Sequence, residues 1–474
     1  MNNNTKALKS GIWYTIANFF TSSIGLITTP IFTRILTKAD FGAYSNYTSW
    51  LSIFNILFTL NLGATLMSAR FDHKDHFDEY ISSSLILSTI SIIAGTIIVN
   101  ILYTPFQDKF GIDRVYLNCM MVYLIMSSAV SMFQIKERYE FEYKITVFVS
   151  LLISLSTAFL SVLLVKYMSN RLRGRIFGAA FPTIIVGAVL YCILFFKGKK
   201  VKIAYWKYAL PIALPYIPHL LAASLLNSMD RIMITNICGK EENALYSLAY
   251  TCGAIISILV TSMNNAYSPW LGHKLNEDTD SSYKEVRSFS KLYIGVFVFS
   301  CIGVMLVTPE LLLIMGKRDY YEARFVMPPI TCGVACQFIY TLFGNIEQYK
   351  KKTVGMAIAS VSAALLNYVL NAIFIPKYGY IAAAYTTLVG YLWLLVAHMF
   401  LVKRLGFSKI YDYKFVILIT AVLICISMGV NYLYNYSPIR YIFIVIYGCI
   451  TIYLALKYGN VLLAKFKSMR DSKA

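Results

Sequence analysis

Residues Tyr208–Ile234, which read YALPIALPYIPHLLAASLLNSMDRIMI, decide how this chain is interpreted. About 20 apolar residues at 1.5 Å each cross the roughly 30 Å hydrocarbon core of a bilayer, so the stretch is long enough to span a membrane. It contains three prolines and four polar or ionisable residues: Pro211, Pro215, Pro218, His219, Asn227, Asp230 and Arg231. Ionisable groups within a span cost about 3 kcal/mol each and usually face a protein interior or a wet cavity. We therefore predict a broken helix that begins a second lobe.

The composition is that of an integral membrane protein. Of the 474 residues, 58% are hydrophobic and 14% are charged, and the mean hydropathy is +0.61. Soluble proteins carry about 45–50% apolar and about 25% charged residues. The net charge of +20 is typical of cytoplasmic loops beside anionic lipid, so we expect no nucleic-acid partner. The nine cysteines form no CxxC pair or Cys/His cluster, and we expect neither a metal site nor disulfides.

The apolar runs predict an all-α fold with about fourteen membrane-spanning helices. The predicted spans are residues 11–34, 41–67, 81–103, 116–135, 145–167, 176–196, 208–235, 244–272, 289–311, 325–347, 354–375, 379–402, 415–434 and 439–462. The first run lacks a small-residue cleavage site and is expected to be a retained helix. No connection exceeds roughly 20 residues and no Walker A sequence occurs, so a nucleotide-binding domain has no room. The function must lie among the helices.

The distribution of basic residues indicates the sidedness of the chain. With the N-terminus in the cytoplasm, the inner segments hold 27 Lys and Arg residues and the outer segments hold 14, so both termini are expected inside. One segment disagrees, because residues 169–175, SNRLRGR, are basic and fall outside. Either this segment lines a passage for an anion, or the count of spans is wrong there.

An internal similarity indicates two lobes. Residues Thr33–Tyr47 read TRILTKADFGAYSNY, and Asp230–Tyr250 read DRIMITNICGKEENALYSLAY. Each has Arg–Ile at a helix end, a short polar turn, and Tyr–Ser at the start of the next helix. Transport folds are commonly built from such repeats, with the substrate path between the halves. We expect two six-helix lobes around a central cavity, in residues 1–200 and 201–405, and two further helices with a cytoplasmic tail in 406–474.

Three segments together carry a family resemblance. They are Gly11 and Tyr14 followed by GLITTPIFTRILTKADFGAYSNY at 25–47, PYIPHLLAASLLNSMDRIMI at 215–234, and NYVLNAIFIPKYGYIAAAYTTLVGYL at 367–392. In this order and spacing the chain resembles the polysaccharide flippases of the multidrug/oligosaccharidyl-lipid/polysaccharide exporter superfamily. The resemblance implies twelve to fourteen helices in two lobes.

The same resemblance implies a function. Such a protein transfers an oligosaccharide linked to undecaprenyl phosphate or pyrophosphate from the inner to the outer leaflet of the bacterial cell membrane, by alternating access. We therefore expect a transporter and not an enzyme, with no cofactor and with coupling to H+ or Na+ left open. Membrane lipids and other polysaccharide-assembly proteins, such as a polymerase, are the expected partners.

The anionic head of this cargo requires a wet cavity with cationic groups for the phosphates. Arg34 and Arg231, at matching places in the two lobes, are the candidate phosphate-binding residues, because a guanidinium holds two oxygens at once and stays charged. The alternative is that both are interfacial anchors at helix ends. Asp230 is a candidate counter-ion to Arg231 or a proton carrier. His219 is a candidate for a proton step, or else a hydrogen-bonded packing residue.

Four further polar residues lie in or near the apolar runs. Asn18 and Asn227 are candidate cavity residues, for which hydrogen bonds between helices are the alternative. Glu347 falls near the inner end of its span and is expected to be an interfacial acid, whereas His398 falls inside a span.

Two other function classes compete with the flippase. An ion-coupled drug exporter of the same superfamily usually carries acidic residues inside its N-terminal lobe, but the first six predicted spans show no clear mid-membrane Asp or Glu, which favours an anionic cargo. A membrane polysaccharide polymerase would present a large outer loop with several arginines, and an acyltransferase a deep histidine with a partner. Residues 166–175 are too short for the first, and His219 has no obvious partner for the second.

Overall fold

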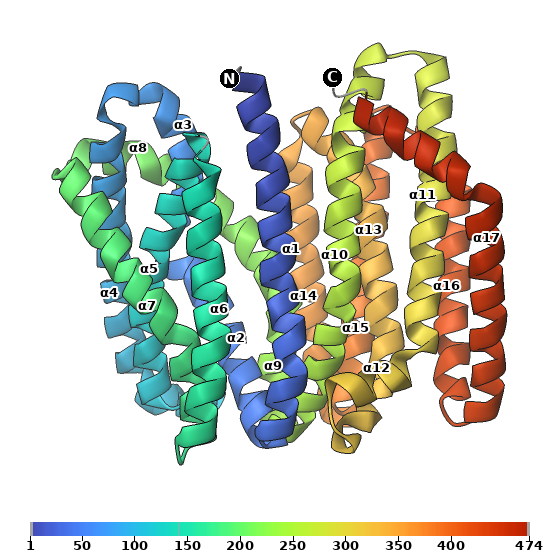
Figure 1. Cartoon of the computed structure of the whole chain (residues 1–474), viewed down its shortest axis with the longest axis horizontal. Helices are drawn as coiled ribbons and strands as arrows, with labels where there is room; N and C mark the ends of the chain where they lie inside the picture. The colour runs from blue at the N-terminus through green and yellow to red at the C-terminus, as the bar shows by residue number, and fades with distance from the viewer. Residues whose placement is uncertain (1–2, 141, 472–474) are drawn as a thin grey trace. The chain divides into compact units, whose positions relative to one another are not determined.

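The computed structural model describes the backbone of residues 3–140 and 142–471, and the side chains of residues 13, 17, 20–140, 142–253, 255–265, 267–352, 354–454 and 456–457. Within this part of the chain every regular element is a helix, which confirms the all-α prediction. The chain forms two compact units, Met1–Ala244 and Leu245–Ala474 (Figure 1). The lobe boundaries expected at residues 200 and 405 remain predictions.

The first unit combines long helices with short pieces. Its elements are α1 (Asn3–Ile35), α2 (Lys38–Phe58), η1 (Leu62–Thr65), α3 (Leu66–Asp72), η2 (Lys74–His76), α4 (Phe77–Phe110), α5 (Arg114–Tyr139), α6 (Tyr143–Tyr167), α7 (Arg171–Gly198), α8 (Ile203–Ala213) and α9 (Tyr216–Ile237). Figure 1 shows α3 and α8 at the same end of this unit. Three helices start at polar caps, Thr37 for α2, Asp113 for α5 and Asn170 for α7, whose side-chain oxygens accept a bond from a backbone N–H of the first turn.

The second unit is built around α13. Its elements are α10 (Lys240–Glu277, whose first residues belong to the first unit), α11 (Asp280–Leu306), α12 (Thr308–Met315), η3 (Arg318–Phe325), α13 (Met327–Tyr349), α14 (Thr353–Tyr378), α15 (Tyr380–Arg404), α16 (Tyr413–Leu433) and α17 (Ser437–Asp471). Helix α13 is the most buried of the candidate spans and packs on α11, α15 and α16. Asn367 on α14 donates to Thr387 Oγ1 on α15 at 3.2 Å, a hydrogen bond between two neighbouring helices.

The number of spans is close to the expected one. Eleven helices in the described part of the chain are long and apolar enough to cross a membrane, and up to thirteen do so if each bent pair is one span. One bent pair is α8 with α9, which meet at 52° beside Pro215, so the predicted break in this stretch is confirmed. The other is α2 with the residues that follow it, at 46°, which was not predicted. The expected count of fourteen is not confirmed.

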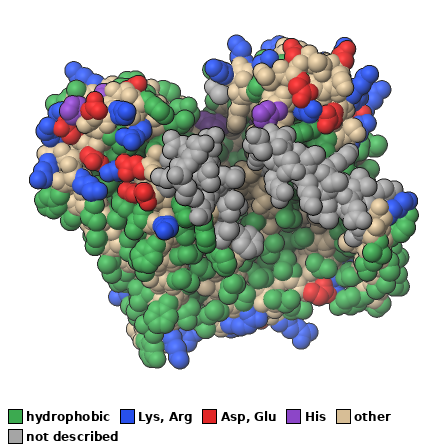
Figure 2. All heavy atoms as spheres, turned by 45° about the horizontal axis from the view of Figure 1, so that its top comes forward, with side chains coloured by type: hydrophobic (Ala, Val, Ile, Leu, Met, Phe, Trp, Pro, Cys, Tyr) green, Lys and Arg blue, Asp and Glu red, His purple; other side chains and the backbone are tan. Residues whose placement is uncertain are grey.

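Helix α6 has one exposed hydrophobic face that is suited to contact lipid. Phe148, Leu152, Leu155 and Phe159 follow helical spacing and are all exposed, Phe159 to 71%. The opposite face of α6 carries Ser154, Thr157 and Ser161, which point inward. Figure 2 shows one face of the molecule, with hydrophobic side chains over its middle and charged ones gathered toward its upper and lower margins. An apolar exterior around a polar interior is expected of a membrane protein that encloses a wet path.

A buried ion pair fixes α17 to the second unit. Arg440 is 2% exposed, and its Nη1 and Nη2 donate to the Glu310 carboxylate at 2.7 and 2.5 Å. Burial alone would raise the pKa of Glu310, but the hydrogen bonds from Arg440, from the backbone and from Tyr441, together with the Arg440 charge, outweigh it, and the pKa is lowered. The pair therefore stabilises the fold above the ordinary pKa of a glutamate, about 4.3, and this contribution is lost as the pH falls through the lowered value.

Glu310→Gln is expected to destabilise the protein by about 2 kcal/mol at neutral pH, because it leaves the Arg440 charge buried without a carboxylate. The effect falls below the 3–5 kcal/mol of fully buried pairs because Glu310 is partly exposed. The measurement is thermal unfolding of the purified protein across pH, where the difference from wild type should shrink in acid. Glu277→Gln, which breaks the exposed pair with Lys274, is the control and should change stability by less than about 1 kcal/mol.

Candidate functional site

Polar side chains line one face of α2 and one face of α5. On α2 this face carries Leu51, Ser52 and Asn55, followed by Thr59 just after the helix, and on α5 it carries Tyr123, Leu124, Ser127, Ser128, Ser131, Met132 and Ile135. Residues three and four apart share a side of a helix, so each set forms a stripe. The opposite face of α5 is apolar and partly exposed, as at Val115 and Val122, so its polar stripe faces away from the surrounding lipid. On α2 the opposite face is buried, as at Ile53 and Phe54, and the polar stripe is the exposed one, at Ser52 and Asn55.

One end of this polar face is closed where α2 stops. After Phe58 the chain turns through Leu60 and Asn61, which have φ of 53° and 48°, a left-handed conformation that non-glycine residues seldom adopt. Thr59 Oγ1 donates to Asn55 O at 2.5 Å and accepts from the Asn61 N–H at 3.3 Å, and these bonds stabilise the turn. The turn ends α2 and leads into η1, whose first residues complete the wall.

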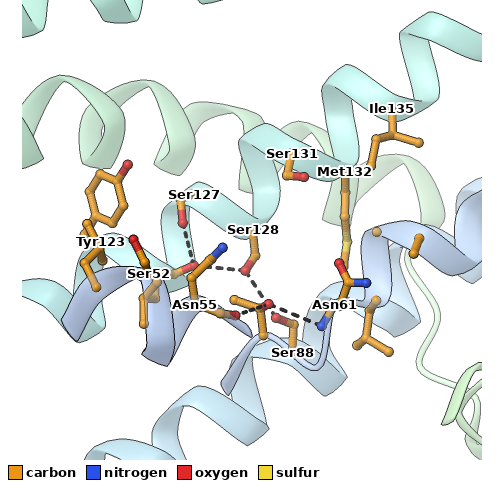
Figure 3. A pocket seen from close by; sticks show the side chains of 16 residues that line it. Ser52, Asn55, Asn61, Ser88, Tyr123, Ser127, Ser128, Ser131, Met132 and Ile135 are labelled. Carbon is orange, nitrogen blue, oxygen red and sulfur yellow. Dashed lines mark hydrogen bonds between the residues drawn. The ribbon is translucent and has the colours of Figure 1, made fainter. Parts of the chain in front are cut away.

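Together with Ser88 of α4, these residues enclose a cavity of about 410 Å³, which we call the Ser/Asn pocket (Figure 3). Ser88 Oγ donates to Ser128 Oγ at 3.2 Å and links α4 to α5. Within the described part of the chain, the side chains of Asn55, Asn61 and Ser131 make no hydrogen bond. Amides and hydroxyls both donate and accept, so this lining is suited to a ligand that carries many hydroxyl groups. The volume is in the range of small-molecule sites.

A second cavity forms around Arg175, near the start of α7. Asn170 caps this helix, its Oδ1 accepting from the Arg173 N–H at 2.9 Å. Gly178 lies against the backbone of α6, where an added Cβ would be 2.4 Å from Ser161 Cα. This close approach brings Ser161 beside Arg175, and Arg175 Nη1 donates to Ser161 Oγ at 2.9 Å.

Two aromatic rings and no acid surround the Arg175 guanidinium. Its central carbon lies 3.8 Å from the centre of the Phe32 ring and 4.1 Å from that of the Tyr44 ring. Among the described side chains no carboxylate pairs with it. A guanidinium has five N–H donors; Ser161 accepts from one of them, and the Tyr44 hydroxyl is a second hydrogen-bond partner. A partly buried cation with donors to spare is suited to an anionic ligand.

The cavity around Arg175, which we call the arginine pocket, measures about 300 Å³ and lies between α1, α2, α5, α6 and α7. Its polar lining is completed by Thr21, Thr28, Tyr44, Tyr47, Tyr123, Ser154, Thr157 and Thr183. Leu51 and Tyr123 line both cavities, so the two adjoin within the first unit. Neither cavity has an Asp or Glu among its described lining residues, in keeping with the expectation for the first six spans.

The arginines and the aspartate that the sequence singled out lie at helix ends or in the interior. Arg34 is exposed at the end of α1, and its Nη1 donates to Pro30 O at 2.7 Å. On α9, Asp230 is fully buried and Arg231 is partly buried. None of the three lines the Ser/Asn pocket or the arginine pocket. Their roles remain predictions.

The other candidates lie on α9 and α1. His219 sits in the first turns of α9, and its Nδ1 is buried without a hydrogen-bond partner among the described residues. Asn227 donates to Ala223 O of its own helix at 2.7 Å. The side chain of Asn18, on α1, lies outside the described residues. His219 and Asn227 line neither pocket.

The residues that do line the pockets were largely missed in the sequence. Arg175 closes the basic segment 169–175, whose position outside conflicted with the count of basic residues, and that conflict was the signal. Arg175 lines the arginine pocket, while both explanations for the segment stay predictions. The serines of α5 gave no signal, because a single Ser in an apolar helix is usually satisfied by its own backbone, as Ser127 is here.

Comparison with known proteins identifies the family. A family model described as Polysaccharide biosynthesis protein matches residues 7–274, more than half of the chain, and a second, MatE, matches residues 211–373. No curated protein matches the chain.

Several solved structures share the fold at low sequence identity. The lipid II flippase MurJ in an inward closed conformation is 15% identical with a TM-score of 0.65, over 95% of this chain and 100% of that one. A multidrug resistance MATE family transporter in an inward-facing conformation is 12% identical with a TM-score of 0.63, over 82% and 95%. A transporter of the MOP superfamily from Pyrococcus furiosus is 14% identical with a TM-score of 0.57, over 85% and 96%. The chain belongs to the polysaccharide biosynthesis protein family, and its fold is that of the transporters and flippases of the MOP superfamily.

Proposed function

We propose that this protein moves an oligosaccharide linked to undecaprenyl phosphate or pyrophosphate from the inner to the outer leaflet of the bacterial cell membrane, by alternating access. The observation that carries the proposal is Arg175, a cation without a carboxylate partner among the described residues, in a cavity that adjoins a pocket of serines and asparagines. An anionic head with a sugar chain has the two chemistries that these cavities complement.

The arginine pocket binds the phosphate part of the cargo, and the Ser/Asn pocket binds its sugar part. The fork of Arg175 binds phosphate oxygens, because guanidinium groups hold two oxygens with charge-assisted bonds. The side chains of Asn55, Asn61 and Ser131 bind sugar hydroxyls in place of water, which lowers the cost of bringing a hydrated group into the membrane. Arg34 and Arg231 are further candidates for the head group, with Asp230, His219, Asn227 and Asn18 as polar residues along the path.

A cationic drug is the less suitable cargo for these cavities. Its charge would meet Arg175 in the arginine pocket, and no acidic residue lines either pocket in the described part of the chain. Like charges at close range repel, so the site disfavours a cation.

The proposal is tested in cells that lack this protein, by following lipid-linked oligosaccharide in each leaflet. We expect the lipid-linked sugar to accumulate on the cytoplasmic face, and a wild-type copy to relieve this accumulation. If nothing accumulates and the cells instead lose resistance to a cationic compound, the drug-exporter alternative replaces the flippase.

Both termini are proposed to lie in the cytoplasm. A polymerase of the same pathway is the proposed partner on the outer side of the membrane.

A further inference from the structure

Two ionisable side chains from different helices meet inside the second unit. His398 Nδ1 of α15 lies 2.6 Å from Glu347 Oε1 of α13, and the residues are 2% and 1% exposed. Glu347, expected to be an interfacial acid, lies two residues before the end of α13 and is buried there. The second carboxylate oxygen, Glu347 Oε2, is buried and has no hydrogen-bond partner in the described part of the chain. A buried oxygen without a hydrogen bond lowers the stability of the fold, so its presence calls for an explanation.

The surroundings of the pair are apolar or aromatic. The Tyr340 ring stacks on the His398 imidazole with centroids 5.1 Å apart. Tyr411, before α16, donates to Leu342 O of α13, and Tyr413 of α16 donates to Met399 O of α15. Other titratable or charged groups on the helices around the pair include Tyr250, Tyr267, Tyr293, Tyr391, Arg287, Lys291, Lys350, Lys351, Lys352, Lys403, Arg404 and Asp412. Lys350, Lys351, Lys352, Lys403 and Arg404 are exposed to solvent. Asp412 forms ion pairs with Arg287 and Lys291.

None of these groups therefore places a second unpaired charge beside Glu347 and His398. The carboxylate with a neutral imidazole carries a net charge of −1, and one added proton makes the pair neutral. A net charge in a dry interior costs far more than an ion pair with hydrogen bonds, so the two protonation states favour different surroundings. Glu347 lies close to the surface, because the next residues, Gln348 to Lys352, are exposed.

We propose that Glu347 and His398 form a proton-binding site that couples transport by this protein to a proton gradient. The inference rests on the proposed transport function, since it names the ion that drives it. On binding, a proton from water forms an N–H bond on the imidazole, and on release the same bond breaks, so no electron is transferred. Among the described residues no third His, Cys, Asp or Glu joins the pair as a metal ligand set would require, and a proton is the ligand that two such groups hold. A ligand shifts a conformational equilibrium only when it binds two states unequally, and the change in net charge supplies that difference.

The test uses the purified full-length protein without cargo and measures amide hydrogen exchange at about pH 5 and about pH 8, corrected for the intrinsic pH dependence of exchange. In wild type, the segments 340–347 and 391–398 should change protection between the two conditions. Glu347→Gln and His398→Gln should each abolish this change, whereas His273→Gln, at an exposed histidine of α10, should retain it.

Two results would overturn the proposal. One is a wild type in which these segments do not respond to pH, and the other is a response that persists in either folded variant. Each substitution removes one partner of the pair, so a single variant that folds is enough to test the proposal. Because no cargo is present, loss of the pH response and loss of leaflet transfer in cells are separate outcomes. If the protein responds to pH but moves no lipid-linked sugar, the proposed proton site stands and the proposed cargo is wrong.

Discussion

Arg175→Ala is expected to reduce transfer of lipid-linked oligosaccharide about 10- to 100-fold in cells that carry no other copy of this protein. Hydrogen bonds to charged groups contribute about 1.5–3 kcal/mol, and 1.4 kcal/mol corresponds to tenfold. The guanidinium contacts Phe32, Tyr44 and Ser161 and has no carboxylate partner in the described part of the chain, so its removal leaves no buried acid unpaired. The variant should therefore fold and insert normally, and transfer is measured by the appearance of the sugar in the outer leaflet.

Arg173→Ala is the matched control, because it removes the same charge from an exposed position two residues away on α7. It should transfer at the wild-type rate. Arg175→Lys should retain part of the activity, since an ammonium keeps the charge but not the planar fork. Arg34→Ala and Arg231→Ala complete the series. If either lowers transfer more than Arg175→Ala does, the head group binds at the helix ends and not in the arginine pocket.

Gly178→Ala is expected to lower the stability of the whole protein by about 1–3 kcal/mol or more, and to reduce transfer with it. An added Cβ would lie 2.4 Å from Ser161 Cα, which is backbone and cannot rotate away, so α6 and α7 must separate. Separation also moves Ser161 away from Arg175. The measurement is the melting temperature and the yield of monodisperse protein after extraction from the membrane.

The same substitution where there is room should have the opposite sign. At Gly295 of α11 an added Cβ meets nothing within 4 Å. Alanine favours a helix over glycine by about 1 kcal/mol, so Gly295→Ala should be neutral or stabilising. Equal destabilisation at both positions would mean that the α6–α7 crossing is not as close as the structure has it.

The positions of the helices could be predicted from the sequence because each needs an apolar run of bilayer length. The break beside Pro215 could also be predicted, since proline removes a backbone donor. The break after α2 could not be, because it occurs at Leu60 and Asn61, where no proline or glycine marks it. Its left-handed residues are held by Thr59 and by the surrounding helices.

The sites depend on which helices lie next to each other, and this limits what sequence reasoning can find. Arg175 becomes a pocket residue only because the glycines of α7 admit the backbone of α6. Glu347 and His398 are 51 residues apart and meet only when α13 packs on α15. By contrast, Arg34 and Arg231 were selected from similar positions in two segments, and similar positions do not by themselves place side chains in a cavity.

The most direct test of the account is transfer by the purified protein in proteoliposomes, with fluorescent undecaprenyl pyrophosphate-linked sugar as one cargo and a cationic dye as the other. We predict that wild type transfers the lipid-linked sugar and not the dye, that Arg175→Ala transfers the sugar about 10- to 100-fold more slowly, and that Arg173→Ala matches wild type. Transfer of the dye without the lipid-linked sugar, or full transfer of the sugar by Arg175→Ala, would contradict the central claim that the first unit binds an anionic sugar-carrying lipid.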